Sequence, residues 1–425
     1  MATFTSTVYQ NEFLPDQGTD VHAIVSVTCD EAGAAGHSGQ DVGEVVIVDT
    51  SGSMIGSGLE MAKQAASVAC DMILDGTWFA IVAGTHQAYL AYPRVTSGPG
   101  LVRMDATTRQ QAKAAIKAFR AEGGTAIGAW LLLAYQLFAS VPGLGGRHAI
   151  LLTDGEDYNE TSSQLDSAIR QCMGQFQADC RGIGVNWKVS ELRKIAQALL
   201  GSVDIIPDER DLPKVMADLI QRAMSRGVAD AQLRVWIPQD AQILFVRQVS
   251  PTVEDLTHRG QAINPLTQAY PTGAWGDESR DYHIAVRLPA KAVGQEQLAA
   301  RVQLSIGTEV LTQGLVKARW SSDPTLTTRI SPEVAHYTGQ TELAAAIQQG
   351  LAARAAGDDR TATLKLGRAV QLAQQTGNTE ATARLQRVVD VTDAATGTVR
   401  LRRDIAKADE MALDTVSTRT TRLRA

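Results

Sequence analysis

The segment Val45–Met54 constrains the fold more than any other part of the sequence. It is an apolar run, VVIV, followed directly by the pattern Asp49-x-Ser51-x-Ser53. A near-continuous apolar run is typical of a strand that is covered on both faces, as in a parallel sheet. One acid and two hydroxyls at alternating positions offer three hard oxygens to a small divalent cation. The segment therefore predicts a buried strand that ends at a metal-binding loop.

Two later segments contain oxygens that would complete such a site. Thr125 follows a pair of glycines, and Asp154 follows a second apolar run, AILLT. In an open parallel sheet, ligands gather in the crevice beside the carboxyl ends of the strands, where both Asp49 and Asp154 are expected. Because Mg²⁺ keeps several of its waters, no single loop has to supply the whole coordination shell.

This set of residues resembles the von Willebrand factor A (VWA) domain with its metal-ion-dependent adhesion site. All five positions match in order and type, within residues 42–226. The resemblance implies that the hydroxyls of Ser51, Ser53 and Thr125 contact Mg²⁺ or Mn²⁺. It also implies that the carboxylates of Asp49 and Asp154 lie partly in a second shell and reach the cation through water. The alternative is that these side chains only cap helices, the first of which is expected to begin near Leu59.

Residues 42–226 alternate between strand and helix patterns. The expected strands are Val45–Val48, Trp78–Ala83, Ala88–Tyr92, Ala149–Leu152, Arg181–Val185 and Val203–Ile206. The expected helices lie near residues 59–75, 106–120, 126–140, 160–173, 189–200 and 212–225, and the first has an apolar face at helical spacing. Alternation at this frequency predicts an α/β fold with a doubly wound parallel sheet.

From Val228 the apolar pattern changes to a period of two, which indicates antiparallel strands and a β-sandwich. The expected strands are Gln232–Ile237, Gln242–Val246, Tyr282–Leu288, Val302–Ile306 and Leu315–Trp320. A similar strand, His22–Thr28, lies near the amino terminus and would be an unprotected edge if it were alone. We therefore expect residues 1–40 to pair with 228–325, so that the VWA domain is inserted in a discontinuous sandwich, as in bacterial members of the family that the chain resembles.

After Pro332 the chain is rich in alanine, with apolar residues at helical spacing in about three segments. A helical bundle docked on the sandwich is favoured over a tetratricopeptide-like array, because one helical pair is too few for a solenoid. The expected division is residues 1–40 for amino-terminal sandwich strands, 41–227 for the VWA domain, 228–330 for the sandwich, 331–412 for the helical domain and 413–425 for a flexible tail.

Composition limits the location and the partners. The formal net charge of −6 gives no general attraction to nucleic acid or to an anionic membrane. The segment Met1–Ser6 lacks the basic and apolar parts of a secretory signal, and no apolar run approaches the roughly 18 residues that span a bilayer. We therefore expect a cytoplasmic protein. The four cysteines lack zinc-site spacing and are expected to be buried thiols: Cys29, Cys70, Cys172 and Cys180.

The expected chemistry is binding rather than catalysis. Neutral hydroxyls leave a bound cation electrophilic, so an Asp or Glu of a protein partner would complete its shell. Phosphoryl-transfer sites instead place carboxylates directly on the metal and add a phosphate cradle or a base. The sequence has neither a Gly-x-x-x-x-Gly-Lys-Ser/Thr run nor a His-Glu-x-x-His motif. We expect a non-enzymatic, Mg²⁺-dependent protein-binding module, which the resemblance to bacterial members associates with signalling or stress response. The alternative is a metal-dependent phosphatase or hydrolase.

Other charged side chains near the expected site have two interpretations. Glu156, Asp157 and Glu160 follow Asp154 and either form an anionic rim that selects against acidic partners or belong to a solvated loop or a helix start, where the helix dipole favours acids. His148 lies beside the second apolar run without a nucleophile motif, so we expect a structural role for it.

The segment Asp414–Ala425 contains four threonines and one serine among basic residues, which indicates a mobile tail open to a kinase. Thr420 with Leu423 resembles the phosphothreonine pattern that forkhead-associated domains read, so such a reader is a candidate partner. The alternative is a frayed terminus that has no role.

Overall fold

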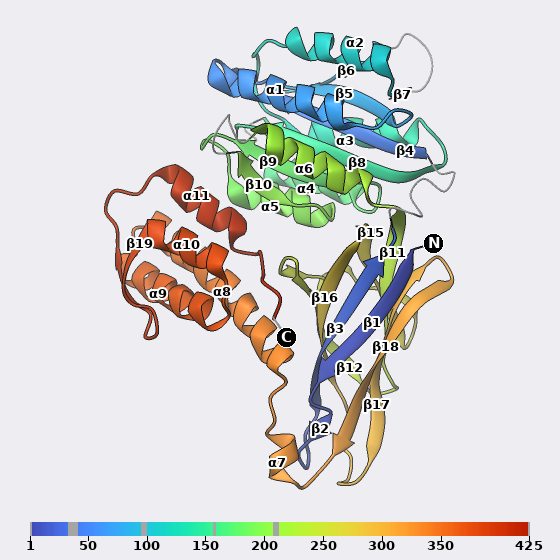
Figure 1. Ribbon diagram of the computed structural model, residues 1–425, viewed down its shortest axis with the longest axis vertical. Helices are drawn as coiled ribbons and strands as arrows, with labels where there is room; N and C mark the ends of the chain where they lie inside the picture. Colours follow the sequence, from blue (N-terminus) through green and yellow to red (C-terminus); the bar gives the residue numbers. More distant parts are fainter. Residues whose placement is uncertain (1, 33–40, 95–99, 156–158, 207–211, 424–425) are drawn as a thin grey trace. The chain divides into compact units, whose positions relative to one another are not determined.

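The computed structural model describes residues 2–32, 41–94, 100–155, 159–206 and 212–423, and the chain forms two compact units. One unit is Gly33–Ala229, and the other combines Met1–Ala32 with Asp230–Ala425. Along the chain, the first unit is therefore inserted between two segments of the second. Figure 1 shows the elements of each unit coloured by sequence.

A seven-stranded sheet forms the centre of the inserted unit. Its order is β10-β9-β8-β4-β5-β6, and β7 also pairs with β5. The strands are β4 (Asp41–Asp49), β5 (Trp78–Gly84), β6 (Ala88–Tyr92), β7 (Val102–Arg103), β8 (Leu144–Thr153), β9 (Gln177–Ile183) and β10 (Val203–Ile206). Pairing is parallel from β10 to β5, whereas β6 and β7 run antiparallel to β5. The sheet is thus mixed at one edge rather than wholly parallel.

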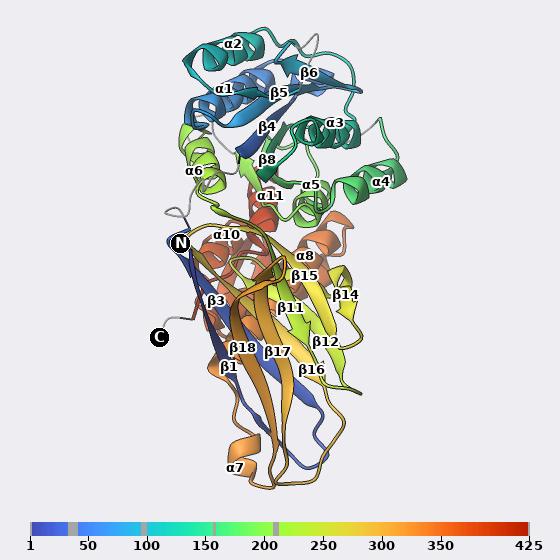
Figure 2. The same ribbon diagram turned by 90° about the vertical axis from the view of Figure 1, so that its right-hand side faces the viewer.

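Helices cover both faces of this sheet (Figure 2). They are α1 (Ser57–Met72), α2 (Ala106–Lys117), α3 (Ile127–Ala139), α4 (Ser162–Cys172), α5 (Val189–Ala198) and α6 (Leu212–Met224). Helix α1 packs beside α2 and α6, and α3 packs beside α4. The apolar sides of α1, α2 and α6 form one buried core with Val46 and Val48 of β4. The doubly wound arrangement expected from the alternation of strands and helices is present.

Strand β9 differs from the expected range Arg181–Val185. It begins at Gln177, which lies opposite His148 of β8, and it ends at Ile183. Gly184 then adopts a φ of +66°, in the left-handed region that glycine tolerates without steric cost. The chain therefore turns out of the sheet before the apolar pattern ends.

Two mainly antiparallel sheets form the sandwich of the other unit, in the orders β1-β3-β16-β12-β13 and β14-β15-β11-β17-β18-β2. The first comprises β1 (Thr3–Gln10), β3 (Asp20–Asp30), β16 (Glu278–Arg287), β12 (Gln242–Ser250) and β13 (Glu254–Asp255). The second comprises β14 (Gln261–Asn264), β15 (Thr267–Trp275), β11 (Val228–Trp236), β17 (Glu296–Ile306), β18 (Glu309–Trp320) and β2 (Phe13–Leu14). Fully buried aromatic side chains contribute to the core of this unit, among them Trp275, Trp320 and Tyr282.

The amino-terminal arm contributes to both sheets of the sandwich. In β3, Cys29 lies opposite Phe4 of β1 on one side and Glu278 of β16 on the other. Strand β2 pairs in parallel with the end of β18. The pairing expected for His22–Thr28 with later strands is therefore observed, and it removes the exposed edge that this strand would otherwise present.

The helical region follows the sandwich and packs on it through its first long helix. Its elements are α7 (Pro324–Thr327), α8 (Pro332–Ala355), α9 (Asp359–Gln375), α10 (Thr379–Val388), the hairpin β19 (Val389–Asp393) and β20 (Thr398–Leu401), and α11 (Lys407–Val416). Tyr337 of α8 is buried with Ile24 and Val249 of the sandwich, and its hydroxyl donates to the carboxylate of Asp281. The hairpin was not expected, because its short polar strands carry no strong apolar period.

The carboxyl-terminal segment differs from the flexible tail expected for residues 413–425. Its first residues belong to α11, where Leu413 and Thr415 are buried, so the helical region extends beyond residue 412. Residues 424–425 lie outside the described part of the chain. The segment contains few apolar residues, and its docking therefore had no periodic signal in the sequence.

Hydrogen bonds and an ion pair hold the rest of this segment against the sandwich. The backbone N–H of Val253 donates to the carbonyl of Thr418 at 2.7 Å, and the hydroxyl of Thr420 donates to a carbonyl of β12 at 2.7 Å. Arg422 pairs with the buried carboxylate of Asp281 at 2.8 Å. An extended, polar segment is thus fixed by satisfied backbone groups and by one neutralised buried charge.

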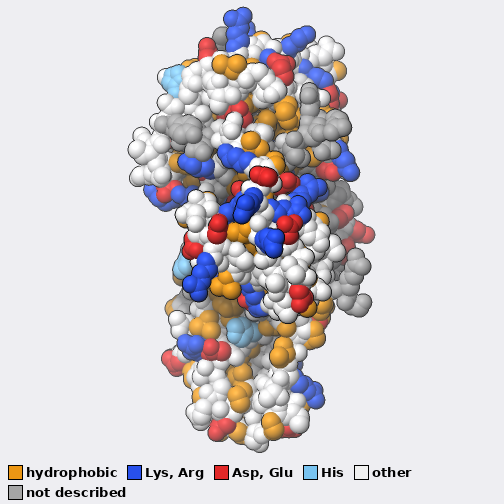
Figure 3. Space-filling model, turned by 90° about the vertical axis from the view of Figure 1, so that its left-hand side faces the viewer, with side chains coloured by type: hydrophobic (Ala, Val, Ile, Leu, Met, Phe, Trp, Pro, Cys, Tyr) orange, Lys and Arg blue, Asp and Glu red, His pale blue; other side chains and the backbone are white. Residues whose placement is uncertain are grey.

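Three further findings concern the surface charge, the apolar length of the helices and the cysteines. Basic and acidic side chains are interspersed on the face drawn in Figure 3, in keeping with the small net charge. Within the described ranges, no helix is long and apolar enough to cross a membrane. The four cysteines are buried free thiols, as the sequence predicts.

Candidate metal centre

The candidate site lies where β4 and β8 end side by side. Val48 of β4 pairs with Leu152 of β8, so Asp49 and Asp154 reach the same edge of the sheet. After β4 the loop is fixed by its neighbours, because the N–H of Gly52 donates to the carbonyl of Gly123 at 2.9 Å. This hydrogen bond also joins the loop of the two serines to the segment that leads to Thr125.

Hydrogen bonds link four of the five predicted side chains. Asp49 Oδ1 accepts from the N–H of Ser51 at 2.8 Å, and the hydroxyls of Ser51 and Ser53 lie 2.9 Å apart. The hydroxyl of Ser53 donates to Asp154 Oδ1 at 2.8 Å. Asp49, Ser51 and Asp154 are buried, whereas Ser53 is exposed. The network is therefore anchored in the interior and reaches solvent at Ser53.

Thr125 meets the network at a small space beside Gly155. A Cβ atom added to Gly155 would lie 3.1 Å from Ser53 Oγ, 3.5 Å from Thr125 Oγ1 and 3.8 Å from Asp49 Oδ2. Three oxygen atoms, two from the loop after β4 and one from Thr125, thus line a space that a side chain at residue 155 would fill. All five predicted residues converge at this edge of the sheet, and their hard oxygens are of the type that Mg²⁺ and Mn²⁺ prefer.

Both carboxyl groups of the site resist ionisation. Burial raises the pKa of Asp49 to about 6, although hydrogen bonds from Ser51 and Thr153 partly offset this effect. Burial also raises the pKa of Asp154, against the hydrogen bond from Ser53. Among the described residues, no cationic side chain forms an ion pair with either carboxylate. A cation at this edge would therefore meet two carboxylates that no cationic side chain of the described residues neutralises.

Hydroxyl groups supply part of the oxygens at this edge of the sheet. Within the part of the chain that the structure describes, no cluster of three or more His, Cys, Asp or Glu side chains is placed to hold a metal ion. The oxygens that the described residues offer at this edge include those of the two carboxylates and of Ser51, Ser53 and Thr125. The resemblance implied such a mixed donor set, and the donor types present here are compatible with it.

Two residues that contact the site, Thr153 and Asn159, are not identified from the sequence alone. The hydroxyl of Thr153 donates to Asp49 Oδ2 at 2.5 Å. Its position at the end of β8, directly before Asp154, is the sequence feature that could have indicated this contact. Asn159 hydrogen-bonds the backbone of Thr125, and no sequence signal marked it. Glu160 was considered as an anionic rim residue or a helix start.

The carboxylate of Glu160 contacts a helix other than the one that follows it in the chain. Its carboxylate accepts from the N–H groups of Gly128 and Ala129 at 2.7 and 3.0 Å, in the first turn of α3. It therefore stabilises the start of a neighbouring helix rather than of its own, since α4 begins at Ser162 with Thr161 as its cap. Glu156 and Asp157 lie outside the described residues.

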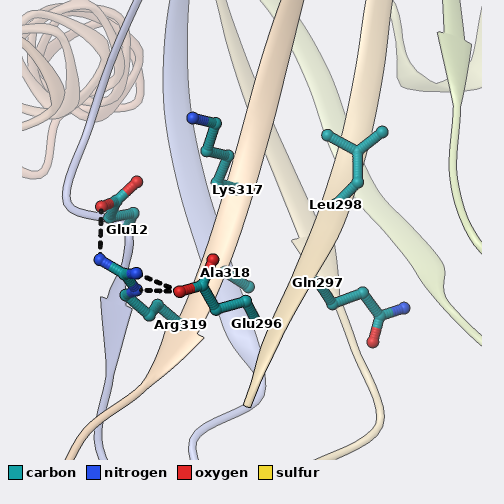
Figure 4. Close-up of a pocket in the computed structure, with 7 residues that line it drawn as sticks. All are labelled: Glu12, Glu296, Gln297, Leu298, Lys317, Ala318 and Arg319. Atoms are coloured by element: carbon teal, nitrogen blue, oxygen red, sulfur yellow. Dashed lines mark hydrogen bonds and ion pairs between the residues drawn. The ribbon is translucent and has the colours of Figure 1, made fainter. Parts of the chain in front are cut away.

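Two other polar clusters are less suited to bind a ligand. A shallow pocket on the sandwich is lined by Glu12, Glu296, Gln297, Leu298, Lys317, Ala318 and Arg319 (Figure 4). Its arginine already pairs with both glutamates, so its main charges are compensated. His148 is buried and hydrogen-bonded by Glu44 and Asp179, which agrees with the structural role expected for it.

Comparison with known proteins identifies the family. The family model of the von Willebrand factor type A domain matches residues 43–205, and that of the von Willebrand factor type A C-terminal domain matches residues 371–417. A solved structure, a von Willebrand factor type A protein from Catenulispora acidiphila, is 46% identical, with a TM-score of 0.92 over 99% of this chain and 97% of that one. The chain belongs to the von Willebrand factor type A family.

Two further comparisons give lower identities. The ArnB paralog VWA2 from Sulfolobus acidocaldarius has a TM-score of 0.61 at 14% identity over 98% of both chains, which shows a shared fold alone. An uncharacterized protein of Synechocystis sp. is 28% identical over 222 residues. The chain spans about half the length of this curated relative, 50%, and the match covers 51% of the chain.

Proposed function

We propose that this VWA protein is a non-enzymatic binding module that holds Mg²⁺ or Mn²⁺ and recruits an acidic side chain of a partner protein. The observation that supports the proposal is the space beside Gly155, which oxygens of Ser53, Thr125 and Asp49 line. Ser51 and Asp154 are hydrogen-bonded to Ser53 and complete the donor set. When bound, the cation would supply a Lewis-acid contact for a carboxylate of the partner.

The arrangement of donors favours binding over hydrolysis. The two carboxylates accept hydrogen bonds from hydroxyls and from backbone N–H groups, which orient them. None of the hydrogen bonds described for the five side chains comes from an imidazole, a thiol or an amine that would serve as a base or a nucleophile. A role in bacterial signalling or stress response belongs to the proposal through the family alone, and a cytoplasmic location belongs to it through the sequence features described above.

The docked position of the carboxyl-terminal segment bears on the proposed partners. The hydroxyl of Thr420 is engaged with the carbonyl of Val249, and Thr415 is buried. A kinase would have to detach this segment before it reached either hydroxyl. We therefore give tail phosphorylation and a forkhead-associated reader no part in the proposed function.

Metal titration of the full chain tests the proposal. Isothermal calorimetry with MgCl₂ is expected to show binding by the native chain and none by Asp49→Ala, because this substitution removes the carboxylate that orients the loop. Asp71→Ala, at an acid near the far end of α1 whose partner is Lys113, is the matched control and should bind as the native chain does. Circular dichroism verifies that each variant is folded.

Two outcomes would count against the proposal. Equal Mg²⁺ affinity in Asp49→Ala would reject the site, and absence of Mg²⁺ and Mn²⁺ binding by the native chain would reject the metal. Turnover of p-nitrophenyl phosphate that requires Mg²⁺ and disappears in Asp49→Ala would favour the hydrolase alternative. Capture of a protein partner from the organism's own extract should depend on Mg²⁺ and be lost with a chelator.

A further inference from the structure

Asn159 forms an unusual pair of contacts with Thr125, 34 residues away along the chain. Its side-chain Oδ1 accepts from the N–H of Thr125 at 2.8 Å, and its own N–H donates to the carbonyl of Thr125 at 3.0 Å. Both backbone polar groups of Thr125 are therefore satisfied by one residue. Asn159 is exposed to solvent, so the two hydrogen bonds, rather than burial of its side chain, hold it against Thr125.

The neighbouring residues are shaped for this contact. A Cβ atom added to Gly124 would overlap the side-chain amide of Asn159, so a residue without a side chain is required there. The next residue, Glu160, accepts from the N–H groups of Gly128 and Ala129 at the start of α3. The cap position of α3 is Ala126, which has no side chain that could accept these hydrogen bonds. Asn159 and Glu160 thus hold Thr125 and the helix that follows it.

We infer that Asn159 is a positioning residue that aims the Thr125 hydroxyl at the cation and couples the segment after Asp154 to the Thr125 loop. This inference rests on the proposed metal-dependent function. Thr125 lies on the loop between α2 and α3, and outside this clamp its backbone N–H and carbonyl have no strand partner among the described elements. Its hydroxyl oxygen lies 3.5 Å from the position that a Cβ atom added to Gly155 would occupy.

The coupling has a simple physical origin. Asp154 and Asn159 are five residues apart in the sequence. Asp154 belongs to the site itself, and Asn159 holds Thr125, so a shift of this segment would affect both Asp154 and Thr125. Residues that orient metal ligands through hydrogen bonds typically change metal affinity by about 10- to 100-fold when they are removed. We expect an effect of this size at Asn159, although the residue does not itself reach the space beside Gly155.

A double-mutant cycle on the full chain tests this inference. Asn159→Ala is expected to lower Mg²⁺ affinity at least tenfold in calorimetry, whereas Asn159→Asp, which keeps an oxygen acceptor for the Thr125 N–H, should retain most of it. In a Thr125→Ala background, Asn159→Ala should have little further effect, because the hydroxyl that it positions is absent. Gln164→Ala is the matched control, since Gln164 caps α4 in the same region without touching Thr125.

The outcomes separate this inference from the proposed function. If the native chain binds Mg²⁺ and Asn159→Ala binds equally well, the inference is overturned while the metal site stands. Losses of affinity that add independently in the double variant would also overturn it, because they would show that Asn159 acts by another route than Thr125. If the native chain takes up no divalent cation, the proposed function itself fails. Thermal unfolding of each variant identifies any loss that is due to unfolding.

Discussion

The buried histidine of the VWA unit supports a quantitative prediction of pH-dependent stability. His148 Nδ1 lies 2.9 Å from the carboxylate of Glu44, and Nε2 lies 2.9 Å from Asp179 Oδ2. All three side chains are at least 94% buried. Burial alone lowers the pKa of His148, but the two carboxylates outweigh it and raise this pKa to about 9. The protonated ring donates from both nitrogens and so satisfies both acids.

The two acids respond differently to the same surroundings. Burial tends to raise the pKa of Asp179, but the hydrogen bond and charge of His148 outweigh it and hold this pKa well below its usual range. Ser202 also donates to Asp179 through its N–H and its hydroxyl, at 2.6 and 2.5 Å. At Glu44, burial is the larger effect and raises the pKa despite His148. The network therefore depends on a charged His148 between two carboxyl groups.

The sign and size of the pH effect follow from the shift at His148. The folded pKa of about 9 exceeds the unfolded value of 6.5, so the folded chain binds the proton more tightly. The associated stability is complete below pH 6.5 and is lost as the pH rises toward 9. One pKa unit corresponds to about 1.4 kcal/mol, so the loss amounts to about 3 kcal/mol. The raised pKa of Glu44 acts in the same direction, beginning from its lower unfolded value.

Calorimetric unfolding of the full chain between pH 6 and 9.5 measures this effect. In the native chain, the unfolding transition of the VWA unit should move to lower temperature as the pH rises above 6.5. His148→Gln should flatten that dependence and lower stability at pH 6.5 by about 3 to 5 kcal/mol, because two buried carboxyls lose their cation. His258→Gln, at an exposed histidine of the sandwich unit, is the control. Parallel pH profiles for the native chain and His148→Gln would refute the reasoning.

Three further substitutions or reactions have expected outcomes. Gly155→Ala should weaken Mg²⁺ binding at least tenfold in calorimetry because its methyl group enters the oxygen-lined space, whereas Gly146→Ala, which meets only ordinary contacts, should not. Arg422→Ala should speed proteolytic cleavage of the carboxyl-terminal segment, because Asp281 loses its cation; an unchanged digestion rate would contradict the docked position. Burial raises the pKa of Cys70 and Cys172 to about 12, so a thiol reagent should modify them only after unfolding.

Local patterns in the sequence were sufficient to predict much of the VWA unit. A buried parallel strand carries a long apolar run, and the acid that ends it must lie at the carboxyl edge of the sheet. The sequence therefore predicts that Asp49 and Asp154 lie at one edge, and they do so in the structure. The order of the hydroxyls in the chain then led to the family resemblance, which the comparisons support at the level of the family.

The remaining features depend on contacts between segments that are far apart in the chain. The clamp of Asn159 on Thr125, the position of Glu160 at the start of α3 and the ion pair of Arg422 with Asp281 each join polar residues across 31 to 141 positions. A single polar residue has no periodicity, so its partner cannot be read from its neighbours. Apolar periodicity reports which face of a strand or helix is buried, whereas the partner of a lone hydrogen bond is decided only when the folded chain brings the two segments together.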